Sequence, residues 1–216
     1  MSLVIKKIVN EPIGSNCFVI FDKVLGNRCV VIDPGFECPS AISNLFINER
    51  LIPEYIILTH EHFDHCFGCI WLNEQYQTPV ICTEACAQRI SNAKSNLSLF
   101  RDGIGFCCTN ETITTESLEN RLLWSTYNIQ YIITKGHTDS GISILINDHL
   151  FTGDTLIKDL KTVTKLKCGS KEDLKHSLQY YQSLKGLGIH IHPGHGDDFD
   201  LDGYDLDVAS SQSVNK

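Results

Sequence analysis

The chain has 216 residues, of which 42% are hydrophobic, and a formal net charge of −8. This length allows one well-filled globular domain or at most two small ones, and the acidic balance disfavours a general nucleic-acid-binding protein, which needs clustered Lys and Arg. No apolar run approaches the length of a membrane span, and residues 1–7 lack the order of a signal peptide, so we expect a cytoplasmic protein.

Apolar runs bounded by turn residues predict strands, and apolar residues at helical spacing predict helices. In the first half of the chain, strands are predicted at residues 3–9, 17–21, 28–32, 55–58 and 79–82. Helices are predicted at residues 42–49, 64–76 and 83–93, the last two capped by Asp64 and Thr83. Residues 92–119 lack periodicity, so we expect a long excursion with little regular structure, suited equally to substrate binding and to surface elaboration.

The second half of the chain predicts more strands and one longer helix. The strands are expected at residues 122–127, 129–134, 142–146, 149–151 and 189–192. The helix begins at Ser170 and stops near Gly186. Before it, the basic stretch from Lys158 to Lys167 is either a solvated loop or a contact for an anionic substrate. The tail after Asp197 is acidic and then Ser-rich, so we expect a domain at residues 1–199 and a frayed tail at 200–216.

Potential metal ligands are concentrated in one short segment, directly after the strand predicted at residues 55–58. His60 and His62 are two residues apart, so an extended backbone sends both imidazoles to the same side. Asp64 and His65 follow at once. Three His and one Asp within six residues exceed what one zinc site with an open position needs, which indicates two neighbouring metals.

Other His and Asp residues follow predicted strands at Gly- or Pro-rich turns. Asp33, His60, His137, Asp154 and His195 all occupy such positions. The carboxyl ends of strands are where sheet proteins build sites, so we expect these side chains to contribute to one. The remaining His residues, His149, His176, His190 and His192, are expected to be structural. Because His190 and His192 share one strand face, a role for them near the metals stays open.

Ten cysteines are many for this length, and without an export signal they are expected to be reduced and mostly buried. A structural zinc site built from Cys66, Cys69, Cys82 and Cys86 is an alternative reading of part of this set.

Five motifs occur in order between Asp33 and Gly196. They are Asp33 itself, His60-x-His62-x-Asp64-His65, His137 in Gly-His-Thr, Asp154 in Thr-Gly-Asp and His195 in Pro-Gly-His-Gly. This set resembles the metallo-β-lactamase superfamily, and within it the glyoxalase II-like hydrolases. The resemblance implies an α+β fold, an αββα four-layer sandwich with a dinuclear site at one edge of the paired sheets.

The resemblance also implies a role for each motif residue. His60, His62 and His137 would bind the first metal. Asp64, His65 and His195 would bind the second, with Asp154 bridging both. Asp33 would orient the site. Zinc suits the His-rich ligation best, and the carboxylates leave iron or manganese open.

The activity implied is that of a metal-dependent hydrolase. Two divalent ions would hold a shared water and lower its pKa, and the resulting hydroxide would attack a carbonyl carbon or a phosphorus, with Asp64 as the proton acceptor. We expect the substrate to be a small ester, thioester or lactone. Glyoxalase II enzymes bind glutathione through basic residues of a C-terminal helical region. Only 21 residues, acidic and Ser-rich, follow His195 here, which disfavours a glutathione thioester as the substrate.

Other activities stay open at this point. One is a phosphodiesterase or nuclease, which the acidic composition disfavours. Another is a mononuclear iron sulfur dioxygenase, and a third is a non-catalytic binding relative. The sequence leaves the oligomeric state undetermined.

Overall fold

A computed structural model of the chain describes residues 3–24 and 26–210, apart from the side chain of Asp102. The chain divides into two compact units, Met1–Leu118 and Glu119–Lys216. No helix within the described ranges is both long and apolar enough to cross a membrane.

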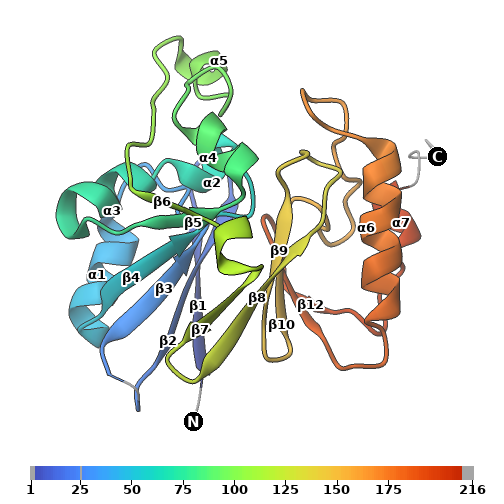
Figure 1. Cartoon of the computed structure of the whole chain (residues 1–216), viewed down its shortest axis with the longest axis horizontal. Coiled ribbons are helices and arrows are strands. Elements are labelled where there is room, and N and C mark those ends of the chain that lie inside the picture. Colours follow the sequence, from blue (N-terminus) through green and yellow to red (C-terminus); the bar gives the residue numbers. More distant parts are fainter. Residues whose placement is uncertain (1–2, 25, 211–216) are drawn as a thin grey trace. The chain divides into compact units, whose positions relative to one another are not determined.

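In the described part of the first unit, six strands form one mixed sheet, and their order in the sheet is their order along the chain (Figure 1). The strands are β1 (Leu3–Asn10), β2 (Ser15–Asp22), β3 (Arg28–Ile32), β4 (Ile52–Ile57), β5 (Val80–Cys82) and β6 (Thr112–Thr114). The β1, β2 and β3 strands are antiparallel, and the pairs from β3 to β6 are parallel. The carboxyl ends of β3, β4, β5 and β6 therefore lie along one edge of this sheet.

Helices connect the parallel strands of this unit. They are α1 (Ser40–Glu49), α2 (Phe63–Cys66), α3 (Cys69–Tyr76), α4 (Glu84–Ile90) and α5 (Leu99–Asp102), followed by the 3-10 turn η1 (Glu116–Leu118). Ile42 and Phe46 of α1 and Leu72 of α3 join the apolar core that covers one face of the sheet. Thr83 caps α4 as predicted, because its side chain accepts a hydrogen bond from the Cys86 amide at 3.2 Å.

Three details of this unit differ from the sequence expectations. The helix expected at 64–76 is interrupted at Phe67–Gly68, between α2 and α3. Asp64 is not its N-cap: His62 occupies that position with an extended backbone, and Asp64 lies in the first turn. The excursion at 92–119 contributes β6, which extends the sheet beyond β5.

In the second unit, among residues 119–210, six strands form a second mixed sheet in the order β12-β11-β10-β9-β8-β7. The strands are β7 (Arg121–Trp124), β8 (Tyr127–Ile133), β9 (Ile142–Ile146), β10 (His149–Gly153), β11 (His190–Pro193) and β12 (Phe199–Asp200). Among the strands described between residues 119 and 210, only β10 and β11 pair in parallel. The strands predicted at residues 142–146 and 149–151 correspond to β9 and β10, which pair antiparallel.

Helix α6 (Lys171–Ser183) covers one face of this sheet (Figure 1). It begins as predicted at Ser170, whose hydroxyl accepts a hydrogen bond from the Asp173 amide at 3.1 Å. Leu174, Leu178 and Tyr181 recur at helical spacing and pack against Leu150 and Ile191 of the strands. The helix therefore holds β10 and β11 from one side.

The fraying expected after Asp197 is wrong for residues up to 210. Leu201, Leu206 and Ala209 are buried in the same core as α6, and α7 spans Asp207–Ser210. The apolar residues interspersed in this acidic segment give it a buried face. Residues 211–216 of the predicted tail lie outside the described residues, and the predicted boundary at residue 199 stays a prediction.

Gly35 allows the turn after β3 to approach the corner between β4 and α2. A Cβ atom at Gly35 would lie 1.5 Å from the carbonyl oxygen of Asp64. A Gly35→Ala substitution should therefore lower the free energy of unfolding by about 3 kcal/mol, because the backbone at this corner has to move. Urea unfolding followed by circular dichroism measures the change.

The matched control is Gly203→Ala, where an added Cβ meets nothing within 4 Å. We expect this variant to unfold within about 0.5 kcal/mol of the wild type. Equal stability of the two variants would contradict the close packing of the Gly35 turn against Asp64.

Candidate metal centre

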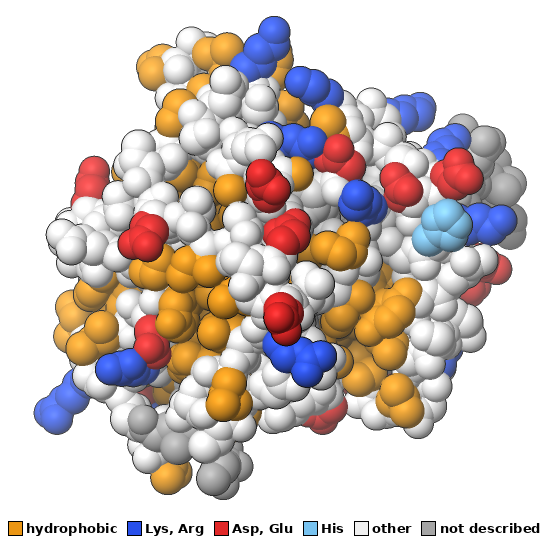
Figure 2. Space-filling model, viewed as in Figure 1, with side chains coloured by type: hydrophobic (Ala, Val, Ile, Leu, Met, Phe, Trp, Pro, Cys, Tyr) orange, Lys and Arg blue, Asp and Glu red, His pale blue; other side chains and the backbone are white. Residues whose placement is uncertain are grey.

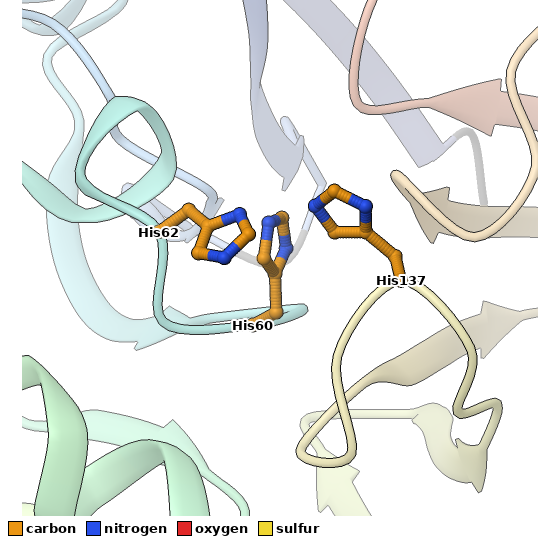
Figure 3. A group of neighbouring side chains, drawn as sticks. All are labelled: His60, His62 and His137. Atoms are coloured by element: carbon orange, nitrogen blue, oxygen red, sulfur yellow. The ribbon is translucent and has the colours of Figure 1, made fainter. Parts of the chain in front are cut away.

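In the first unit, the segment after β4 gathers the imidazoles of the first motif. The rings of His60 and His62 lie next to each other, with centroids 4.7 Å apart (Figure 3). The His65 ring, at the end of the first turn of α2, lies with its centroid 4.3 Å from that of His60. All three side chains are buried, although imidazole is polar. Buried imidazoles need hydrogen-bond partners or ligands, because burying an unpaired polar group is costly.

Asp33 is one of these partners. It follows β3 in a left-handed conformation, with φ of 49°. Its carboxylate accepts hydrogen bonds from the amide of Thr59 at 2.8 Å and from the hydroxyl of Thr59 at 2.6 Å. It also contacts Nδ1 of His65 at 3.1 Å. Because a carboxylate only accepts, this contact assigns the proton of the neutral His65 ring to Nδ1.

Thr59 orients the His60 ring in a similar way. The Thr59 hydroxyl has a single hydrogen, which it donates to Asp33. Its contact of 3.0 Å with Nδ1 of His60 is therefore one in which the ring nitrogen donates. The neutral His60 ring thus carries its proton on Nδ1 and its lone pair on Nε2. The sequence analysis did not single out Thr59, and only its position directly before the His motif pointed to it.

The two acidic residues within the first motif have different environments. The carboxylate of Asp64 lies 3.6 Å from Nε2 of His65, measured between Oδ2 and the ring nitrogen. Glu61 is also buried, but its Oε1 forms an ion pair with Nη1 of Arg89 at 2.9 Å. Asp64 therefore lies beside the ring nitrogen that is opposite to the Asp33 contact, whereas Glu61 is neutralised by Arg89.

In the second unit, the three remaining motif residues meet around one carboxylate. His137 follows β8 (Figure 3), Asp154 follows β10 and His195 follows β11. Nε2 of His137 and Nε2 of His195 each lie 3.6 Å from the same oxygen, Oδ2 of Asp154. The parallel pairing of β10 and β11 explains why Asp154 and His195 are neighbours.

The His137 ring is oriented by the backbone. Nδ1 of His137 lies 2.8 Å from the carbonyl oxygen of Val163, which can only accept a hydrogen bond. The neutral ring therefore carries its proton on Nδ1 and turns Nε2 toward Asp154. Val163 belongs to the loop that contains the basic stretch from Lys158 to Lys167, so this loop positions His137 through its main chain.

These groups meet the chemical requirements of divalent metal ligands. Metal-binding His residues commonly donate their second ring N–H to a carboxylate or a backbone carbonyl. Zn–N bonds of about 2.0–2.1 Å at tetrahedral angles place neighbouring donor atoms about 3.3 Å apart. The separations of 3.6 Å around Asp154 and between Asp64 and His65 are close to this spacing. Each unit on its own therefore presents imidazole and carboxylate donors suited to a metal.

The cysteines form a different environment. Cys66, Cys69, Cys82 and Cys86 are buried in the apolar core of the first unit. Burial raises the pKa of the thiols of Cys66, Cys69 and Cys86, which disfavours the thiolate form that binds metals. The groups of metal-binding side chains found among the described residues contain no cysteine. The alternative of a structural Cys zinc site therefore has no support from the geometry.

The remaining His residues fall into two kinds. His176 is exposed on α6. His149, His190 and His192 lie together on β10 and β11, with ring centroids 5.0 to 6.1 Å apart. Burial lowers the pKa of His149, and the neighbouring His192 lowers it further.

Comparison with known proteins identifies relatives of this chain. A family model described as the metallo-β-lactamase superfamily matches residues 10–189. The probable polyketide biosynthesis zinc-dependent hydrolase BaeB of Bacillus velezensis is 26% identical over 189 residues, which are 88% of this chain and 76% of that protein. Hydroxyacylglutathione hydrolase 1 of Vibrio vulnificus is 34% identical over 149 residues, which are 67% of this chain and 48% of that enzyme. The match to the second relative thus covers about half of its length.

The fold is shared with solved structures. The B3 metallo-β-lactamase BLEG-1 aligns with a TM-score of 0.81 and 23% identity, covering 92% of this chain and 94% of that one. This likeness confirms the α+β metallo-β-lactamase fold expected from the motifs. Together with the family match over residues 10–189, it establishes that the chain belongs to the metallo-β-lactamase superfamily.

Proposed function

We propose that the protein is a metal-dependent hydrolase in which the two groups of ligands act as one dinuclear centre. The first metal would be held by His60, His62 and His137. The second would be held by Asp64, His65 and His195, with Asp154 as a ligand of both. Asp33 would orient the centre without binding a metal.

The observation that carries this proposal is the protein oxygen that lies beside Nδ1 in three of the rings. In His60, His65 and His137, a protein oxygen within 3.1 Å contacts Nδ1. Each neutral ring therefore presents the lone pair of Nε2, the atom that a metal ion needs. A set of ordinary buried His residues would have no reason to share this arrangement.

The donor set favours zinc. Five imidazoles and two carboxylates suit Zn²⁺, which prefers nitrogen and tolerates carboxylate oxygen. The relative BaeB is named as a zinc-dependent hydrolase, which supports the same ion here. Iron and manganese stay open, because carboxylate ligands also suit them.

A pair of such ions would supply hydroxide near neutral pH and neutralise negative charge that develops on the substrate. Within this chemistry, the residues of the chain have separate tasks. Asp33 and Thr59 keep His65 and His60 in one tautomer, and Val163 does so for His137. We assign to Asp64 a second role as proton acceptor, because its carboxylate is partly exposed, with 14% of the side chain accessible.

For the substrate we propose a small ester, thioester or lactone. The name of the Vibrio vulnificus relative, a hydroxyacylglutathione hydrolase, indicates a thioester and supports this class. The net charge of −8 disfavours the alternative of a phosphodiesterase or nuclease. On the face drawn in Figure 2, acidic and basic side chains are interspersed, whereas a nucleic-acid surface gathers basic ones. The third alternative, a sulfur dioxygenase, would contain one iron per chain.

The first test concerns the metals. The purified chain loaded with Zn²⁺ should contain at least about two ions. His62→Ala should lower kcat/KM by more than about 100-fold, above the range for residues that only orient ligands. Elemental analysis and thioester hydrolysis measure the two effects. His176→Ala, on the exposed side of α6, is the control and should match the wild type. A wild type holding a single iron would contradict the proposal and favour the dioxygenase.

The second test concerns the orienting carboxylate. Asp33→Asn keeps the size of the side chain but replaces one of its two accepting oxygens by an NH2 group, which only donates. The amide and the hydroxyl of Thr59 and the His65 ring can then no longer all donate to this side chain. Metal affinity or activity should fall by about 10- to 100-fold. Competition with a chromophoric chelator measures the affinity.

Asp159→Asn is a matched control for this variant, since Asp159 also has a left-handed backbone, with φ of 57°. Its metal affinity should remain that of the wild type. If both variants bind metal like the wild type, Asp33 does not orient the centre.

The third test concerns the substrate. Metal-loaded protein should hydrolyse a thioester or a lactone with kcat/KM of at least about 10⁴ M⁻¹s⁻¹ and a phosphodiester far more slowly. The same preparation of His62→Ala serves as the background for all three assays. Preference for the phosphodiester would overturn the proposed class in favour of the nuclease alternative.

A further inference from the structure

A second group of His and Asp side chains lies on the sheet of the C-terminal unit and shares no residue with the proposed catalytic centre. It consists of His149, His190, His192, Asp198 and Asp200 and is called the β10–β11 His cluster below. In the parallel pair of β10 and β11, His149 is opposite His190 and Phe151 is opposite His192. Since side chains alternate along a strand, the three His side chains share one face.

This face is the one opposite to α6. The intervening residues Leu150 and Ile191 point into the core that α6 covers. On the cluster face, the His192 ring stacks on Phe151, with centroids 4.7 Å apart and planes at 19°. This stacking holds His192 in place, with 5% of its side chain accessible.

Both nitrogens of His192 have close polar neighbours. Nε2 lies 3.0 Å from Nδ1 of His149. Nδ1 lies 3.0 Å from Oδ2 of Asp198. Next to it, Nδ1 of His190 lies 2.7 Å from Oδ1 of Asp200, on the paired strand β12. The cluster thus repeats the pattern of an imidazole beside a carboxylate twice, at His190 and at His192.

We propose that His190, His192 and Asp198 form a binding site for a further divalent transition-metal ion, best suited to Zn²⁺. One donor atom from each of the three residues lies within 4.8 Å of the other two. The contact of 3.0 Å between His192 and Asp198 is near the spacing of about 3.3 Å between neighbouring ligands of tetrahedral zinc. A cation there would replace the proton that the two residues now share.

The other two members of the cluster have supporting roles. Asp200 accepts from Nδ1 of His190 and so directs the opposite nitrogen of that ring, as carboxylates do for metal-binding His. His149 contacts Nε2 of His192, the nitrogen opposite to the one that faces Asp198, and so helps to orient that ring. Two imidazoles and one carboxylate leave a fourth position for water, which is a donor set that zinc accepts.

The metal would tie together strands that are otherwise weakly joined at this edge. The strand β12 has two residues and pairs with β11 through His190 and Ile191. Asp198 lies just before β12, whereas His190 and His192 belong to β11. A bound ion would therefore fasten the segment at residues 198–200 to the sheet and raise the thermal stability of the protein.

The test compares zinc content and stability of the full chain with those of His190→Gln and Asp198→Asn. After equilibration in buffered Zn²⁺ and desalting, each variant should contain about one ion fewer per chain than the wild type. Added Zn²⁺ should raise the Tm of the wild type more than that of either variant. His190 and Asp198 are chosen for the test because His192 is buried and stacked on Phe151, so that its replacement would also change the packing.

Two controls separate this site from the proposed catalytic centre. His176→Gln, on α6, should retain the zinc content of the wild type. The second control starts from His137→Gln, in the proposed catalytic centre. The double variant His137→Gln/Asp198→Asn should contain about one ion fewer than His137→Gln alone. Because the measured quantity is a difference between variants, it does not depend on how many ions the catalytic centre holds. Equal zinc content and equal Tm response in the wild type, His190→Gln and Asp198→Asn would overturn the proposal.

Discussion

The arrangement of the proposed ligands in the first unit depends on the carboxylate of Asp33. This residue lies at the end of β3, where the Asp33 amide still donates to the carbonyl of Ile57 at 3.1 Å, next to the end of β4. A buried carboxylate is costly unless several donors surround it, and here Thr59 and His65 supply them. One side chain thereby fixes the backbone after β4, the ring of His65 and, through Thr59, the ring of His60.

In the C-terminal unit, the parallel pairing of two strands brings the proposed ligands together. The strands β10 and β11 lead directly to Asp154 and His195, whose side chains approach to 3.6 Å. The same two strands carry His149, His190 and His192, so residues of the proposed zinc site and of the proposed catalytic centre lie along one strand pair. An ion bound by His190 and His192 would stabilise the pair that positions Asp154 and His195.

Much of the fold could be predicted because its strands are apolar runs with clear turns between them. The runs that became β3 and β9 have the predicted bounds, and Ser170 begins α6 as expected. The strand β6 was missed because Thr112-Ile113-Thr114 is too short to show alternation, and its partner β5 lies about thirty residues earlier. The break between α2 and α3 also left no local signal, because it depends on Gly68 packing against Pro34 and Phe36.

The sequence by itself determined the family and the types of side chain that are proposed as ligands, because the spacing of His and Asp within each motif is a local property. It could not determine which nitrogen of each ring carries the proton. That choice depends on Asp33 for His65 and on Val163 for His137, which are 32 and 26 residues away along the chain. The β10–β11 His cluster likewise exists only through strand pairing, since His149 and His192 are 43 residues apart. Spacing selects the donors, and tertiary contacts orient them, because hydrogen bonds act over a few ångströms whatever the separation in sequence.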